Sequence, residues 1–373
     1  MKTLIPTYFL IAAGFFSCGS DDDDVLKGPK GAPVWTQGYP QIAHGAVSVD
    51  LNVQNDKTSK VYYIIANKAL TLSASEVMKY AVKPNTSNIK FSGVIEAPSG
   101  QETRKTITGL SEHTTYHTYL VAQNKSDTLF QFDVQGGKFT TYYRQDTSEF
   151  TSLAEDRKVK YLIYRPEEAL KYPDKQYPMC YFIAGNGEVA SPDKPINMIR
   201  NGSLPEYIYK GNNVDMMVMS IQHTKKDWNV SVIDEGIEHG NTTYPVNQKK
   251  VYLTGMSGGA FGVWNYAVAH PEKLAAIVPI SGGGNKGKAC MLKDLPVWAF
   301  HNQTDNSVAS SNTTTMINAI KACPPSKEIK QLMFPDKGHD CWRRVYDKKH
   351  ANWSKSPSVE KFDIYQWMLS KSK

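Results

Sequence analysis

The stretch VYLTGMSGGAFGVWNYAVAHPEKLAAIVPISGGG, from Val251 to Gly284, contains the elements that decide the fold. It begins as an apolar strand (Val251 to Thr254), passes through a glycine-rich turn and continues with the pattern of a helix (Ala260 to Ala269). A second apolar run follows and ends in three glycines. Continuous apolar strands that alternate with helices indicate a parallel sheet covered on both faces.

The turn itself, Gly255 to Gly259, matches the pattern G-x-S-x-G. In such a turn the serine has a strained backbone between strand and helix, and the glycines relieve the crowding around it. The helix that follows offers free N–H groups and a dipole that favours negative charge. Because Ser257 lies between a predicted strand and a predicted helix, we expect it to be a nucleophile; simple backbone punctuation is the alternative.

A serine nucleophile needs a base and an acid that orients the base, in the chain order serine, acid, histidine. PVWAFHNQTDNSV places Asp305 just after a strand, and LMFPDKGHDCW places His339 just after the last strand. Loops at the carboxyl edge of a parallel sheet meet at one site. We therefore predict the triad Ser257, Asp305 and His339.

Other carboxylates compete for the role of the acid. Asp336 and Asp340 are close to His339 in sequence, and neighbours on one loop usually point apart. Asp227 precedes the nucleophile in the chain, which makes it a poorer fit.

The oxyanion hole requires two backbone N–H donors. We expect one from Gly258, the residue after the nucleophile, and the other from the turn FIAGNGE, at Asn186 or Gly187, with Asn186 preferred. Trp228 and Trp342 lie in loops near the same edge. Each is expected either to stack on a sugar or phenolic acyl group or to anchor its loop, with equal weight.

This strand and helix alternation predicts a catalytic domain over residues 150–373, with a helix over SVIDEGIEHGNTTY, another over NTTTMINAIKAC and a terminal helix over VEKFDIYQWMLSK. Residues 33–142 differ, because short alternating strands such as KVYYIIA and TYHTYLVAQN follow one another between turn residues. That spacing predicts an all-β sandwich that is a spacer, a docking module or a sugar-binding module. GLSEHTTYHTYLVAQN resembles the end of a fibronectin type III domain, with Leu110 in the core and Tyr116 as the tyrosine corner.

The N-terminus predicts export. Lys2 precedes the apolar run Leu4 to Phe16, which is too short to cross a bilayer, and residues 1–17 are interpreted as a signal peptide. The sequence FSCG resembles a bacterial lipobox in which Cys18 is lipidated. The acidic linker over residues 18–32, with its run Asp21 to Asp24, resembles the surface-export tag of Bacteroidetes lipoproteins. We expect an outer-membrane lipoprotein exposed at the cell surface, with a periplasm-facing protein as the alternative.

Composition limits the partners and the redox chemistry. The net charge of +7 comes from scattered basic pairs, which favours a solvated surface over nucleic-acid binding. No metal-site spacing of cysteine and histidine is present, and we expect no cofactor. Export permits a disulfide, for which Cys290 and Cys323 are the preferred pair, whereas Cys180 in an apolar strand is expected to be a buried thiol.

Three motifs together resemble an α/β-hydrolase group that contains feruloyl and acetylxylan esterases and polyhydroxybutyrate-depolymerase-like proteins. They are YLTGMSGGAFGVWNYAVAHPEKLAAIVPISGGG, LPVWAFHNQTDNSV and FPDKGHDCW. The resemblance implies an esterase without a cofactor, acting on acylated polysaccharide, with its functional residues at Ser257, Asp305 and His339. Two departures exist, because that group usually has His-Gly where this chain has Ala184-Gly185, and often methionine where it has Gly258. A peptidase or lipase on the same fold and a non-catalytic glycan-binding lipoprotein are the alternatives.

Overall fold

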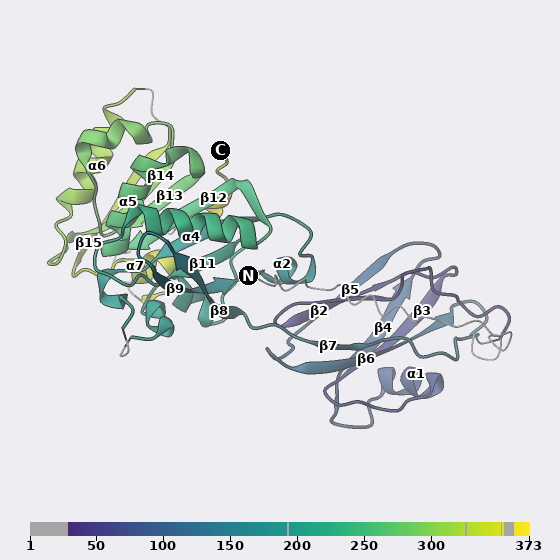
Figure 1. The fold of residues 1–373 in the computed structure, drawn as a ribbon. Helices are drawn as coiled ribbons and strands as arrows, with labels where there is room; N and C mark the ends of the chain where they lie inside the picture. Colours follow the sequence, from purple (N-terminus) through teal and green to yellow (C-terminus); the bar gives the residue numbers. More distant parts are fainter. Residues whose placement is uncertain (1–28, 192–193, 325–326, 352, 354–361) are drawn as a thin grey trace. The chain divides into compact units, whose positions relative to one another are not determined.

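The computed structural model describes residues 29–191, 194–324, 327–351, 353 and 362–373. The predicted signal peptide, the lipidation site Cys18 and most of the acidic linker lie outside these residues. The chain divides into two compact units at Tyr143/Arg144 (Figure 1). The second unit thus begins earlier than the expected residue 150, because the edge strand β8 (Gln145–Ser152) already pairs with β9 (Arg157–Tyr164).

The first unit consists of two antiparallel sheets that share one core, as the strand pattern predicts. The sheets have the orders β1-β2-β5 and β4-β3-β6-β7. Leu51 and Ile107 of the first sheet are buried in the same cluster as Val61 and Leu120 of the second. The strands are β1 (Gln41–His44), β2 (Ser48–Val53), β3 (Ser59–Ala66), β4 (Ile89–Ala97), β5 (Thr103–Thr108), β6 (Thr115–Asn124) and β7 (Lys138–Thr140).

Two details of this unit test the sequence interpretation. The Tyr116 hydroxyl accepts the Ser111 N–H at 3.0 Å and Leu110 is buried, so both expectations for these residues are confirmed. The expectation of an all-β unit was wrong, because helix α1 (Ala74–Val82) lies within it. Ser73 and Glu76 form a capping box that starts this helix, and Val77 packs in a cluster with β3 and β6 residues.

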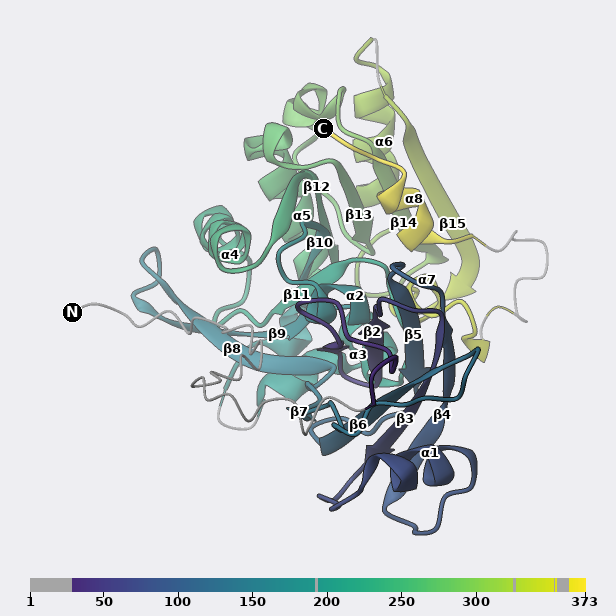
Figure 2. The same cartoon turned by 90° about the vertical axis from the view of Figure 1, so that its right-hand side faces the viewer.

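The second unit is built on an eight-stranded sheet of order β15-β14-β13-β12-β10-β11-β9-β8, parallel except at β9 and β8. The prediction of a mostly parallel sheet with helices on both faces is confirmed (Figure 2). The remaining strands are β10 (Tyr177–Ile183), β11 (Met217–Ile221), β12 (Val246–Met256), β13 (Ala276–Ile280), β14 (Val297–Thr304) and β15 (Ile329–Lys337).

Alternating residues of each strand face opposite layers of helices. Tyr181 and Ile183 of β10 pack with α4, α5 and α6, whereas Cys180 and Phe182 pack with α3, α7 and α8. The helices of this unit are α2 (Glu167–Lys171), α3 (Leu204–Tyr209), α4 (Val230–Thr243), α5 (Gly258–Ala269), α6 (Ser311–Lys321), α7 (Trp342–Tyr346) and α8 (Ile364–Leu369). The start of the expected terminal helix falls on residues that the structure does not describe.

The strand order places a topological switch point at β10. β10 has β11 on one side and β12 on the other, so the chain reverses its direction of progress across the sheet at β10. Such a switch point separates the loops that follow the two strands and leaves space between them. The turn Ala184 to Asn186 follows β10, and Ser257 follows β12, so both lie at this position.

Candidate active site

Ser257 occupies the sharp turn between β12 and α5. Its backbone has φ 53° and ψ −124°, a strained conformation for a residue with a side chain. Its N–H donates to the Ile280 carbonyl at 3.0 Å, which ties the turn to the end of β13. Strain of this kind costs of order 1–3 kcal/mol and persists only where the surrounding structure enforces it.

The glycines after Ser257 allow two backbone segments to approach closely. A Cβ atom added to Gly259 would lie 2.2 Å from the Ile183 carbonyl oxygen, and one added to Gly258 would lie 2.2 Å from Asn186 Oδ1. The Ile183 carbonyl next to Gly259 belongs to β10 and cannot move aside without disturbing that strand. The glycine-rich turn therefore brings the nucleophile against the end of the neighbouring strand.

We expect Gly259→Ala to destabilise the second unit by about 3 kcal/mol or more, because the new methyl group overlaps the backbone of β10. The control is Gly187→Ala, which adds the same methyl group where no atom lies within 4 Å. Urea unfolding of both variants measures the difference. Equal free energies of unfolding for the two would contradict the packing argument.

The structure brings the three predicted catalytic side chains together. His339, in the loop between β15 and α7, has Nε2 2.7 Å from Ser257 Oγ and Nδ1 2.7 Å from Asp305 Oδ2. Asp305 lies between β14 and α6. A continuous chain of hydrogen bonds thus runs from a buried carboxylate through an imidazole to a serine hydroxyl.

The Asp305 carboxylate is buried and both of its oxygens are occupied. Oδ1 accepts the N–H groups of Ser307 and Val308 at 2.8 and 2.9 Å. Burial on its own raises the pKa of Asp305, but the hydrogen bonds from His339 and the two N–H groups outweigh it and lower the pKa below its usual value. Asp305 is therefore held as a carboxylate.

The competing carboxylates have other partners. Asp340 pairs with Arg343 at 3.0 Å, and Asp336 pairs with Arg344. Asp227 is exposed, and its Oδ1 accepts a hydrogen bond from Asn186 Nδ2 at 3.4 Å. Each competing carboxylate thus has a local structural role.

Two buried polar side chains that sequence reasoning missed hold the His339 loop. Ser281 Oγ donates to the His339 carbonyl at 3.2 Å, and Asn302 Nδ2 donates to the Gly338 carbonyl at 2.9 Å. Ser281 has a φ of 56°, which glycine adopts more easily. The available sequence signal was the position of Ser281, directly after an apolar strand and before three glycines.

A second histidine, His301, supports Asp305 from within β14. Its Nε2 lies 3.2 Å from Asp305 Oδ2 and 3.0 Å from the Val308 carbonyl, and its Nδ1 lies 2.8 Å from Thr313 Oγ1. His301 is fully buried.

The residues of the predicted oxyanion donors lie close together, since a Cβ atom added to Gly258 would lie 2.2 Å from Asn186 Oδ1. Gly258 is the first residue of α5 and Asn186 the first residue of a 3₁₀ turn, Asn186–Glu188. N–H groups at a helix start have no acceptor within their own helix. A Cβ atom added to Gly185 would lie 3.4 Å from Ser257 Cβ, so the turn directly faces the nucleophile.

The two predicted tryptophans differ in role. Trp228 is only 7% exposed and its Nε1–H donates to the Ala184 carbonyl at 2.8 Å, so it anchors its loop and presents no face to a substrate. Of its two expected roles, substrate stacking is therefore wrong for Trp228, and loop anchoring is the role that the structure supports. Trp342 is partly exposed and stands edge-on to the His339 ring, with centroids 5.0 Å apart.

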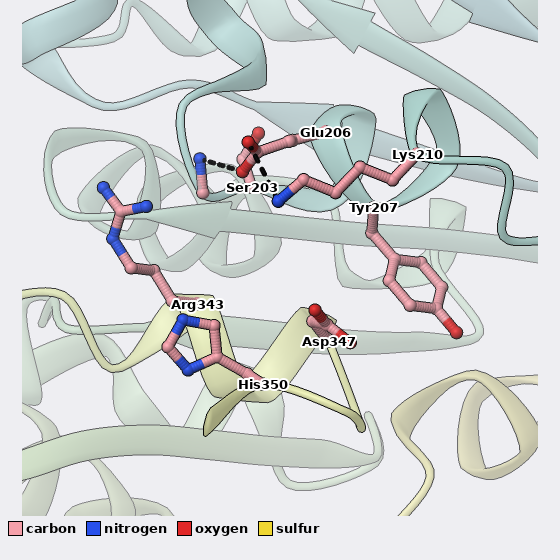
Figure 3. A pocket seen from close by; sticks show the side chains of 8 residues that line it. Ser203, Glu206, Tyr207, Lys210, Arg343, Asp347 and His350 are labelled. Carbon is pink, nitrogen blue, oxygen red and sulfur yellow. Dashed lines mark hydrogen bonds and ion pairs between the residues drawn. The ribbon is translucent and has the colours of Figure 1, made fainter. Parts of the chain in front are cut away.

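A polar pocket lies between α3 and the segment that begins with α7 (Figure 3). Glu206 on its wall accepts the Gly202 N–H at 2.6 Å and pairs with Lys210 at 3.1 Å. The pocket is lined by Gly202, Ser203, Glu206, Tyr207, Lys210, Arg343, Asp347 and His350. The pocket residue Arg343 belongs to α7, the helix that follows the loop carrying His339 in the chain.

Cysteine pairing agrees with the expectation from sequence. Cys290 and Cys323 form a disulfide with an S–S distance of 1.96 Å. Cys180 and Cys341 are free and buried. Among the described residues, no group of three or more acidic, histidine or cysteine side chains is placed to hold a metal ion. In the same residues, no helix has the length and apolar character needed to cross a membrane.

Comparison with known proteins gives structural neighbours only. No family model matches the chain, and no curated protein matches it significantly. A thermostable esterase is 15% identical with a TM-score of 0.49, and the match covers 89% of this chain and 99% of that chain. A mutant feruloyl esterase module from Clostridium thermocellum, complexed with sinapinate, is 18% identical with a TM-score of 0.44, covering 55% and 86%. A putative dienelactone hydrolase from Klebsiella pneumoniae is 15% identical with a TM-score of 0.42, covering 61% and 99%.

Proposed function

We propose that this chain is a serine esterase of the α/β-hydrolase fold that removes acyl groups from complex polysaccharide. The observation that supports it most directly is the hydrogen-bonded chain Ser257, His339 and Asp305, with 2.7 Å at both junctions. A strained serine, a histidine within reach of its hydroxyl and a buried carboxylate on that histidine are the parts that acyl transfer requires.

In the first step, Ser257 Oγ attacks the ester carbonyl carbon while His339 Nε2 takes the hydroxyl proton. The Asp305 carboxylate keeps the remaining imidazole proton on Nδ1 and stabilises the cation that forms. The carbonyl oxygen becomes an oxyanion and accepts hydrogen bonds from the Gly258 and Asn186 N–H groups. The intermediate then collapses: the bond to the leaving oxygen breaks, and the imidazolium protonates that oxygen to release the alcohol.

In the second step, water hydrolyses the acyl-enzyme. His339 Nε2 takes one proton from water, and the resulting hydroxide attacks the acyl carbon. Collapse of the second oxyanion breaks the bond to Ser257 Oγ, which recovers its proton from the imidazolium. The acyl group leaves as a carboxylic acid, and no cofactor takes part in the cycle.

The surroundings of the triad favour a hydroxylated leaving group. The pocket between α3 and α7 is lined by charged side chains, and α7 directly follows the loop that carries His339 (Figure 3). Trp342 offers a partly exposed ring beside His339 for a phenolic acyl group or a sugar face. Feruloyl and acetyl esters are therefore the proposed substrates.

The first unit and the N-terminus are assigned by the same proposal. We propose a fibronectin type III-like domain, supported by the sheet orders and the Tyr116 hydrogen bond. We propose that this domain is either a spacer or a substrate-binding module. Residues 1–17 would direct export and Cys18 would carry the lipid anchor to the outer membrane.

A substrate panel combined with fluorophosphonate labelling tests the proposal. We expect release of ferulate or acetate from esterified xylan fragments and stoichiometric labelling of the wild type. Turnover of peptides or long-chain lipids alone would assign the site to a peptidase or lipase. A wild type that neither labels nor hydrolyses any ester would be a non-catalytic protein.

A further inference from the structure

Two ring N–H groups hold the turn that faces Ser257. Trp228 Nε1–H donates to the Ala184 carbonyl at 2.8 Å, and His223 Nε2 lies 3.3 Å from the Gly185 carbonyl oxygen. The Gly185 carbonyl also accepts the Glu188 N–H at 3.1 Å. Consecutive carbonyls of the turn are thus fixed from one loop, the segment after β11.

Fixing these carbonyls fixes the N–H groups on their other side. In a trans peptide the C=O of one residue and the N–H of the next lie in one plane and point in opposite directions. A hydrogen bond on the Gly185 carbonyl therefore sets the direction of the Asn186 N–H, which is the predicted oxyanion donor. The bond on the Ala184 carbonyl sets the plane of the preceding peptide in the same way.

The protonation state of His223 suits this task. Burial lowers the pKa of His223 to about 4, so at neutral pH the ring is uncharged and carries a single N–H. The Gly185 carbonyl is only an acceptor, so that proton is on Nε2. Within the described part of the chain, Nδ1 is buried without a hydrogen-bond partner, which agrees with an unprotonated nitrogen.

The two rings form one rigid support. They are stacked with centroids 4.3 Å apart and planes 7° from parallel, and both residues are buried. Gly262 of α5 lets Trp228 pack closely, because a Cβ atom there would lie 2.9 Å from Trp228 Cβ. Trp228 thus packs against α5, the helix whose first residue, Gly258, is the other predicted donor.

We propose that His223 and Trp228 are positioning residues of the oxyanion hole, acting through the peptide planes of Ala184 and Gly185. The inference rests on the proposed esterase function. It also gives a structural reason why the turn functions with Ala184: the ring donors that fix it come from the loop after β11 instead of from the turn itself.

The test compares two tryptophan variants. Trp228→Phe keeps an aromatic ring over His223 but removes the N–H. Trp264→Phe is the matched control, since Trp264 is also fully buried and its Nε1 has no hydrogen-bond partner among the described residues. We expect kcat of Trp228→Phe to fall by about 10-fold to 100-fold with KM unchanged, less than the loss of a whole donor. Trp264→Phe should retain the wild-type kcat.

A second pair covers the case in which Trp228→Phe fails to fold. His223→Phe keeps the stacked ring without a donor, whereas His223→Gln restores a donor, so kcat should fall in the first and recover in the second. All rates are divided by the number of active sites from end-point fluorophosphonate titration, which removes the effect of misfolded protein. Variants that match the Trp264→Phe control in kcat, or that change only KM, overturn the inference. A wild type without activity overturns the proposed function instead.

Discussion

Replacing Ser257 with alanine is expected to lower kcat for ester hydrolysis by roughly 10⁵-fold to 10⁶-fold, because no other atom in the proposed mechanism forms the acyl-enzyme. The variant should also lose all fluorophosphonate labelling. Its fold should be unchanged, since alanine keeps the backbone strain at φ 53° and removes only the hydroxyl that contacts His339. Initial rates on feruloyl and acetyl esters, together with thermal unfolding, measure both expectations.

Ser231→Ala is the matched control for this variant. Ser231 is an exposed serine at the start of α4, in the same unit of the structure. It should keep the wild-type rate and labelling. If Ser257→Ala retained more than a small fraction of the activity, the nucleophile would have to be another residue, and the proposed mechanism would be wrong.

The site could be predicted from sequence where its chemistry depends on local order. Ser257 could be predicted as the nucleophile because a strand, a tight turn and a helix follow one another in a single stretch. Asp305 and His339 were recognised because each ends a predicted strand of a parallel sheet, and the carboxyl ends of such strands meet. The structure places both side chains on one hydrogen-bonded chain with Ser257.

The supports of the site could not be predicted in the same way. Ser281 and Asn302 act on the backbone of a loop that is far away in sequence, so their roles depend on the register between β13, β14 and β15. Trp228 was open to two interpretations, because an aromatic residue in a loop near the site looks the same in sequence whether it points out or in. Only its burial and its bond to Ala184 decide between them.

In the first unit, the strand pattern led to an all-β prediction that missed one helix. Alternation predicted β3 and β6, which both contribute buried residues to the shared core, and the spacing of Leu110 and Tyr116 predicted the corner. Helix α1 was missed although Ser73 and Glu76 have the capping-box spacing. Its buried residues Ala74, Val77 and Ala81 also recur at the spacing of one helix face.

Strain and support occur together around the nucleophile. Ser257 and Ser281 both have positive φ, at the ends of the adjacent strands β12 and β13, and both hydroxyls contact His339, one at Nε2 and the other at the carbonyl. Strained residues of this kind lower stability unless their neighbours compensate. In this structure the compensation comes from hydrogen bonds: the Ser257 N–H donates to Ile280, and the Ser281 N–H donates to Phe300.

Asp305→Asn is the second variant with a large expected effect, a loss of about 10⁴-fold in kcat. The reason follows from the two oxygens of the carboxylate. Oδ1 accepts the N–H groups of Ser307 and Val308, so the amide oxygen of asparagine takes that position and the NH₂ group faces His339. His339 Nδ1 must then accept a hydrogen bond, which moves the ring proton to Nε2. In that tautomer Nε2 cannot take the proton of Ser257.

The neighbouring carboxylates provide matched controls for the same chemical change. Asp340→Asn removes a charge next to His339 in sequence, but this residue pairs with Arg343, so we expect less than about a threefold change in kcat. Asp336→Asn removes the negative charge that pairs with the buried Arg344 and should lower stability, while kcat per active site stays close to that of the wild type. Equal losses in kcat for Asp305→Asn and Asp340→Asn would mean that the acid has been assigned to the wrong strand end. A selective loss at Asp305 would show that the His339 tautomer set by this carboxylate, rather than the charge around His339, controls the rate.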